Sequence, residues 1–166
     1  MLDPGRILAH GALLSVLASL VLMGAVTFNP RFALKDLPRD IRESAPPLTK
    51  RERRQALIFF IPFMALLVGI PVLSALGLEA EGAVDVSFGV LFVHVLGVLF
   101  VFFIVDLVVL DWFIYCTITP KCLVIPGTEG MAGYKDYLHH LRVHARGMVW
   151  LAIAALVLAA IVRIIR

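Results

Sequence analysis

The chain has 166 residues, of which 61% are hydrophobic and only 16% are charged. This composition excludes an ordinary soluble domain. The net charge is +3, and the two cysteines, Cys116 and Cys122, are too few for a disulfide framework. Four apolar runs approach the roughly 20 residues that cross a bilayer. The sequence therefore predicts one all-α domain over residues 1–166, an integral membrane bundle of four transmembrane helices.

The first predicted span covers residues 7–27, and His10 lies near its start. A signal peptide would carry its basic residues before the apolar run, whereas here they follow it. They lie in a first connector, residues 28–55, which holds eight Lys or Arg against four acids. Within this connector, Thr49 and Glu52 have the spacing of a capping box, so we expect a helix to begin there and to enter the membrane.

Two predicted spans follow the first connector. The second span, residues 56–78, contains Pro62 and Pro71, which we expect to kink the helix. The third span, residues 87–115, is longer than one crossing of the bilayer requires. We therefore expect its last residues to lie among the lipid headgroups.

Three ionisable residues of the predicted spans are candidates at membrane depth: His10, His94 and Asp106. An ionisable side chain at membrane depth is a functional candidate. Asp106 falls near the inner edge of the membrane, where the alternative is a carboxylate that reaches water. His10 and His94 lie on different spans, and two imidazoles can hold a haem iron axially. For these two histidines we favour hydrogen bonds between helices over haem.

The second connector, residues 116–146, ends in a segment that gathers three His with Asp, Lys, Arg and Tyr. On a helical projection this segment has an apolar stripe beside a cationic stripe, which predicts a juxtamembrane amphipathic helix. We expect Gly147 to act as a hinge between this helix and the fourth span, residues 147–165. Basic residues of both connectors are candidates for lipid or anion contact: Lys50, Arg51, Arg53, Arg54, Lys135, Arg142 and Arg146.

The amphipathic segment also contains candidate metal ligands, because one Asp and two His fall on a third stripe of the projection. The spacing His-x3-His places two imidazoles on one helix face, where they can bind the same metal ion. Imidazoles and carboxylates suit a divalent transition metal. The candidate ligands are Asp136, His140, His144 and Glu129, with Asp106 or Asp111 as further members. The alternative, which we favour, is that these are interfacial polar residues of a surface helix.

The distribution of charge predicts the orientation in the membrane. With both termini outside, the two connectors place twelve of the fifteen Lys and Arg in the cytosol. Residues 29–52 and 126–140 also resemble segments of small four-helix membrane proteins of bacteria that have no known activity. The resemblance covers the two connectors and implies a multi-pass protein of the bacterial inner membrane. It implies no reaction.

The function that these features favour is that of an accessory or binding protein, which contacts lipid or a partner through its cytosolic face. One alternative is a metal-dependent membrane enzyme with an Asp/His site on the cytosolic side. A second alternative is a transporter, which would require an oligomer. Whether the chain is an enzyme stays open at this point. The expected partners are membrane lipids, with a protein partner or a homo-oligomer as further candidates and no nucleic acid.

Overall fold

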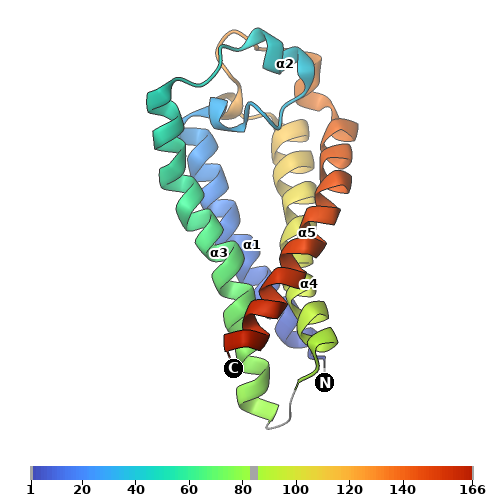
Figure 1. Ribbon diagram of the computed structural model, residues 1–166. Helices are drawn as coiled ribbons and strands as arrows, with labels where there is room; N and C mark the ends of the chain where they lie inside the picture. Colours follow the sequence, from blue (N-terminus) through green and yellow to red (C-terminus); the bar gives the residue numbers. More distant parts are fainter. Residues whose placement is uncertain (1, 83–85, 166) are drawn as a thin grey trace.

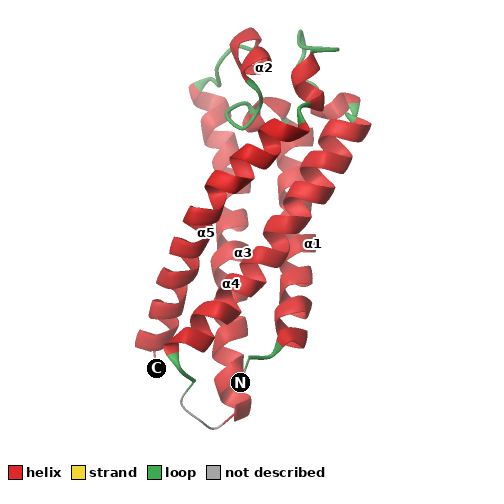
Figure 2. Ribbon diagram, turned by 90° about the vertical axis from the view of Figure 1, so that its right-hand side faces the viewer, coloured by secondary structure: helices red, strands yellow, loops and turns green. Residues whose placement is uncertain are grey.

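The computed structural model describes residues 2–82 and 86–165, and these residues form helices and turns without a strand. Four long helical segments run the length of the molecule (Figure 1, Figure 2). They are α1 (Pro4–Phe28), α3 (Lys50–Gly82), α4 (Phe88–Val105) with its continuation η2 (Asp106–Ile118), and α5 (Tyr137–Ile165). All four segments are long and apolar enough to cross a membrane, which confirms the predicted bundle.

Local sequence signals determine where two of these helices begin. The Asp3 side chain caps α1 by accepting a hydrogen bond of 3.0 Å from the backbone N–H of Arg6, and Pro4 opens the helix. At α3, the backbone N–H of Thr49 donates to Glu52 Oε2 at 2.8 Å, and the backbone N–H of Glu52 donates to Thr49 Oγ1 at 3.3 Å. This reciprocal pair is the predicted capping box.

Small residues allow close helix packing in the membrane-spanning part. α1 packs against α3 and α4, and α4 also packs against α5. A Cβ on Gly11 would lie 2.5 Å from Cβ of Val101, so only glycine fits where α1 meets α4. An apolar core fills the interior of this part of the bundle: Leu14, Ala18, Ala75, Leu91, Val95, Val98, Leu99, Ala155 and Ala159.

The fourth span is one continuous helix, α5, from Tyr137 to Ile165. The predicted amphipathic segment is therefore helical, but the expected hinge at Gly147 is absent. A Cβ on Gly147 would lie 3.4 Å from Cε2 of Phe103, an ordinary van der Waals contact, so the residue lies within α5 where the helix packs against α4. The third span also extends beyond its predicted end, to Ile118.

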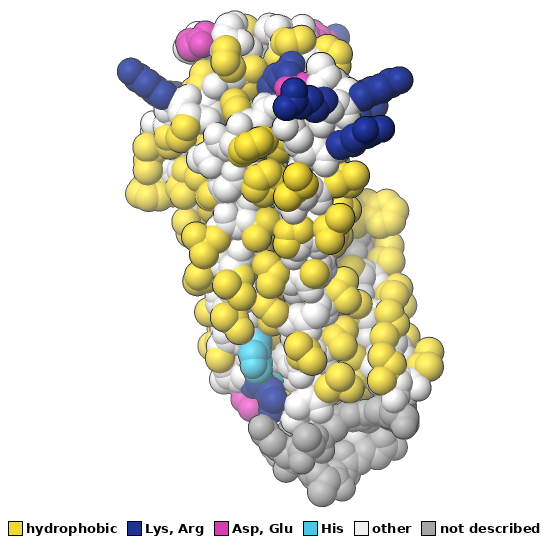
Figure 3. Space-filling model, turned by 90° about the vertical axis from the view of Figure 1, so that its left-hand side faces the viewer, with side chains coloured by type: hydrophobic (Ala, Val, Ile, Leu, Met, Phe, Trp, Pro, Cys, Tyr) yellow, Lys and Arg dark blue, Asp and Glu magenta, His cyan; other side chains and the backbone are white. Residues whose placement is uncertain are grey.

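The two connectors fold into a cap over one end of the bundle, which we call the loop end. Both ends of the chain lie at the opposite end, the terminal end (Figure 1). The cap contains η1 (Pro30–Ala33), α2 (Arg39–Ser44), η3 (Lys121–Leu123) and η4 (Ala132–Lys135). It has a core of its own, formed by Leu34, Leu37, Ile41, Tyr115, Leu123, Ile125 and Tyr134. Lys and Arg side chains gather mainly around the loop end, whereas hydrophobic side chains cover the surface of the helical bundle below it (Figure 3).

Side-chain hydrogen bonds hold the cap in one arrangement. The Tyr134 hydroxyl accepts a hydrogen bond of 2.9 Å from the backbone N–H of Ile125 and lies 2.7 Å from Thr128 Oγ1. Asp40 of α2 accepts a hydrogen bond of 2.9 Å from the backbone N–H of Gly133, which joins the first connector to the second. The cap therefore fixes the position of the first connector relative to α5.

Candidate functional site at the loop end

The third span changes its winding at the point where its two carboxylates lie. From Asp106 to Ile118 the backbone forms a π-helix, in which residue i bonds to residue i+5. The backbone N–H of Thr119, for example, donates to the carbonyl of Ile114 at 2.9 Å. In an α-helix, residues five apart point about 140° away from each other. In the π-helix they lie about one turn apart, so Asp106 and Asp111 share one face.

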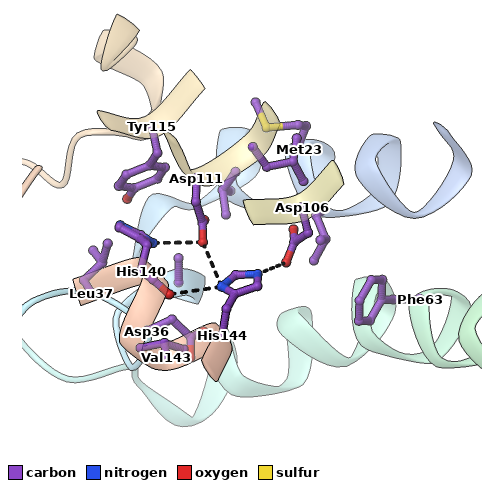
Figure 4. Close-up of a pocket in the computed structure, with 14 residues that line it drawn as sticks. Met23, Asp36, Leu37, Phe63, Asp106, Asp111, Tyr115, His140, Val143 and His144 are labelled. Atoms are coloured by element: carbon purple, nitrogen blue, oxygen red, sulfur yellow. Dashed lines mark hydrogen bonds and ion pairs between the residues drawn. The ribbon is translucent and has the colours of Figure 1, made fainter. Parts of the chain in front are cut away.

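That face meets two buried histidines of α5. His140 Nδ1 lies 2.9 Å from Asp111 Oδ2. His144 Nε2 lies 3.3 Å from Asp106 Oδ2, and its Nδ1 lies 3.5 Å from Asp111 Oδ2. Figure 4 shows both imidazoles directed toward the two carboxylates. The site is therefore a pair of Asp–His contacts, built from the end of the third span and the beginning of the fourth.

The hydrogen bonds of His144 specify where protons lie. Its Nδ1 is 3.1 Å from the backbone carbonyl of His140, and a carbonyl can only accept. Nδ1 therefore carries the hydrogen of this bond. Nε2 can bond to the Asp106 carboxyl only if one further proton lies between them, on the imidazole or on the carboxyl. The Asp106–His144 contact is thus a place where the protein holds one exchangeable proton.

These residues line a cavity of about 300 Å³ between all four helical segments and the cap. Its polar wall consists of Asp36, Asp106, Asp111, Tyr115, His140 and His144. Its apolar wall includes Met23 and Val26 of α1 and Phe63 of α3. Among the described residues that line the cavity, none is Lys or Arg. The cavity therefore combines an acidic wall with an apolar one.

Asp36 completes the acidic wall from the first connector, just after η1. Its carboxylate has no hydrogen-bond or ion-pair partner among residues 2–82 and 86–165. Its backbone carbonyl, however, lies 2.9 Å from His139 Nε2, which fixes the residue against α5. Although the residue as a whole is exposed, desolvation by the surrounding protein atoms and, after it, the negative charges of Asp111 and Asp106 raise the pKa of the Asp36 carboxyl. Its anionic form is therefore disfavoured in this environment.

The structure separates the predicted metal ligands into two groups. His140 and His144 lie together, facing Asp111 and Asp106. Asp136 instead accepts a hydrogen bond of 2.8 Å from the backbone N–H of His139 at the beginning of α5. Glu129 lies in the exposed loop, where both of its carboxylate oxygens accept from the backbone N–H of Gly127.

Among the described residues, the two imidazoles form their ion pairs with Asp111 and Asp106 and not with Asp136 or Glu129. Within the described part of the chain, no three His, Cys, Asp or Glu are arranged to hold a metal ion. The binding of a transition metal stays a prediction. The sequence alone does not predict Asp36 and Tyr115 as site residues, because no local pattern links them to the histidines of α5.

His10 and His94 lie together nearer the terminal end and share one hydroxyl. Ser74 Oγ of α3 is 2.9 Å from His10 Nδ1 and 2.7 Å from His94 Nε2. His94 is fully buried, and its Nδ1 has no hydrogen-bond partner among the described residues. The expected hydrogen bonding of these histidines between helices is confirmed, with Ser74 as the partner that the sequence did not indicate.

The basic residues proposed for lipid or anion contact are exposed at the loop end. Four of them lie in the first turns of α3 and two in the first turns of α5, with one in η4: Lys50, Arg51, Arg53, Arg54, Arg142, Arg146 and Lys135. They are therefore available to phosphates at the membrane surface.

The sequence and fold of the chain provide no identification by similarity. No protein-family model, curated protein or solved structure matches the chain.

Proposed function

We propose that this chain is a multi-pass membrane protein that binds a small organic cation, a protonated amine, in the cavity at the loop end. The observation that carries the proposal is the charge of the wall. Asp36, Asp106 and Asp111 contribute three carboxylates, and no Lys or Arg is among the described lining residues. With all three carboxylates ionised and both imidazoles protonated, one negative charge remains. A cleft lined by one sign of charge concentrates ions of the opposite sign.

Asp36 is the residue that we expect to contact the ammonium group. Asp106 and Asp111 already face His144 and His140, whereas the Asp36 carboxylate has no such partner among the described residues. The negative charges of Asp111 and Asp106 contribute to the raised pKa of Asp36. A bound cation would offset this repulsion and would restore the ionised form of Asp36.

The apolar wall supports an organic cation over a bare ion. Met23, Val26 and Phe63 present hydrocarbon to the cavity. Aromatic rings such as those of Phe63 and Tyr115 also attract ammonium groups through their π faces. A volume of about 300 Å³ is at the lower end of the range for ligand pockets. We therefore expect a small amine with an alkyl or aryl part.

The packing of the bundle supports a binding role. The interior toward the terminal end contains Leu14, Val95 and Val98, each with 0% exposure. This core separates the cavity from the terminal end, as expected for a binding or accessory protein.

The positive-inside rule supports a cytosolic loop end with both termini outside, and the resemblance of the connectors supports a bacterial inner membrane. Ligand would then enter from the cytosol.

The test is ligand binding to the purified full chain. Calorimetry and thermal unfolding would compare butylamine with butanol and butyrate, which match its size but lack the positive charge. We expect only the amine to bind and to raise the unfolding temperature. Asp36→Asn should weaken amine binding about tenfold or more, because a hydrogen bond to a charged group contributes about 1.5–3 kcal/mol.

Glu43→Gln is the matched control, because it removes an exposed carboxylate of α2 that pairs with Arg39 outside the cavity. This variant should bind the amine as the unchanged chain does. Equal binding of butanol, or full binding by Asp36→Asn, would overturn the proposal. Stoichiometric uptake of zinc or manganese with no response to amines would instead favour the metal-dependent alternative.

A further inference from the structure

A second pocket at the loop end has the opposite charge. It has a volume of about 360 Å³ and is lined by Leu34, Lys35, Arg42, Ala45, Pro47, Leu48 and Arg53. We propose that this pocket binds the phosphate-bearing headgroup of an anionic phospholipid, with Lys35, Arg42 and Arg53 as the residues that contact phosphate. This site is separate from the acidic cavity and does not depend on the function proposed for it.

The three cations come from three different parts of the fold. Lys35 follows η1, Arg42 belongs to α2, and Arg53 lies in the first turns of α3. They line one pocket because the first connector folds back over the beginning of α3. No Asp or Glu is among its described lining residues. A convergence of cations without a compensating acid is what a phosphate group requires.

The neighbouring basic residues are engaged elsewhere, and this contrast singles out the three cations. Arg31 forms an ion pair with Glu52, and Arg39 pairs with Glu43 at 2.6 Å. The side chains of Lys35, Arg42 and Arg53 make no hydrogen bond or ion pair with another described residue, and all three are exposed. Their charges are thus available to a ligand.

The surroundings of the pocket favour a lipid over free phosphate. Leu34, Ala45, Pro47 and Leu48 give it apolar walls beside the cations. Below it, Leu57 and Ile61 follow Arg53 at intervals of four residues, so the three share one face of α3. Leu57 is 51% exposed and Ile61 is 65% exposed. An acyl chain can therefore lie along α3 while its headgroup occupies the pocket.

The experiment compares two triple variants of the full chain after removal of bound lipid. One variant combines Lys35→Gln, Arg42→Gln and Arg53→Gln. The other combines Lys50→Gln, Arg51→Gln and Arg54→Gln, which removes the same charge from the same end of the molecule but outside the pocket. The probe is cardiolipin in mixed micelles, with phosphatidylcholine as the neutral lipid, and binding is read by native mass spectrometry.

We expect both variants to lose the diffuse attraction that basic residues at a membrane surface share, and the pocket variant to lose at least about tenfold more affinity for cardiolipin than the matched variant. Equal losses in the two variants would overturn the proposal, because they would indicate only a diffuse attraction. Displacement of cardiolipin by inorganic phosphate alone would show that the pocket binds free phosphate. Cardiolipin should bind with the same affinity in the presence and absence of butylamine, so that failure of the amine site can be distinguished from failure of this one.

Discussion

Asp106 and Asp111 lie on the same face of the third span although five residues separate them. Both line one cavity, and both face His144, at 3.3 Å and 3.5 Å. The π-helix from Asp106 to Ile118 makes this possible, because an α-helix would turn one of the carboxylates away. π-helical segments are rare and are often found at functional sites. The winding of the third span is therefore part of the site.

The first prediction concerns Asp111, whose carboxylate faces both His140 and His144. Asp111→Asn should lower the free energy of unfolding by about 1–3 kcal/mol, because it removes charge-assisted contacts from two buried imidazoles. Chemical unfolding in detergent measures this change. A double-mutant cycle with His140→Gln should show a coupling of about 1 kcal/mol. Additive effects would contradict the Asp111–His140 contact.

The second prediction concerns pH. Because the pKa of Asp36 is raised above its ordinary value of 3.8, its ionised form is disfavoured in the folded state. Stability should therefore decrease as the pH rises through the raised pKa, and the loss should vanish below the ordinary value. Asp36→Asn should be more stable than the unchanged chain at neutral pH and equally stable in acid. Thermal unfolding over a pH series measures this difference.

Protonation of the Asp36 carboxylate should also control amine binding. As the pH falls through the raised pKa, Asp36 becomes neutral and affinity for butylamine should decrease. Asp106, Asp111, His140 and Lys35 also act on this carboxyl, so the decrease should be broader than a single titration. Calorimetry on Asp36→Asn provides the control, because its weaker binding should change less between the same pH values. A pH dependence as large as that of the unchanged chain would contradict the assignment to Asp36.

Much of the fold follows from local sequence signals, whereas most of the site does not. The apolar runs, the Thr49–Glu52 capping box and the shared face of His140 and His144 depend on residues close in sequence. Asp136 and Glu129 are also near the two histidines in sequence, but local backbone N–H groups donate hydrogen bonds to their carboxylates. Asp36 lies about a hundred residues from its contact with α5, and only tertiary packing brings it there. The π-helix has no sequence signature that would have placed Asp111 beside Asp106.

The third prediction compares two serines inside the bundle. Ser74→Ala should cost about 1 kcal/mol of stability, because the Ser74 hydroxyl bonds to both His10 and His94 and hydrogen bonds between membrane helices contribute about this amount. Ser19→Ala is the control, because the buried Ser19 hydroxyl has no hydrogen-bond partner among the described residues. That change should be neutral or stabilising. Equal effects of the two substitutions in thermal unfolding would argue against the Ser74 contacts.

The fourth prediction concerns close packing of α1 against α4. Gly11→Ala should destabilise the bundle by about 1–3 kcal/mol, because its new methyl group would overlap Val101. Gly69→Ala is the matched control in α3, where a Cβ would meet nothing within 4 Å. Alanine is the better helix former, so this control should gain up to about 1 kcal/mol. Adding Val101→Gly, which removes the Cβ that the new methyl group would overlap, should make the cost of Gly11→Ala smaller than in the unchanged chain, and an equal cost in both backgrounds would place the strain elsewhere.

The fifth prediction concerns the side of the membrane on which the loop end lies, since this decides where an amine would enter the cavity. Cys122 is exposed at the loop end and Cys116 is buried, so Cys122 is a native probe for a membrane-impermeant maleimide. With a cytosolic loop end, Cys122 should react only after the membrane is opened. In a Cys122→Ser background, Ser44→Cys should behave in the same way, whereas Gly5→Cys at the terminal end should react in intact cells. Reaction of Ser44→Cys in intact cells would reverse the orientation and make the acidic cavity accessible from outside, and the amine would then have to be supplied there.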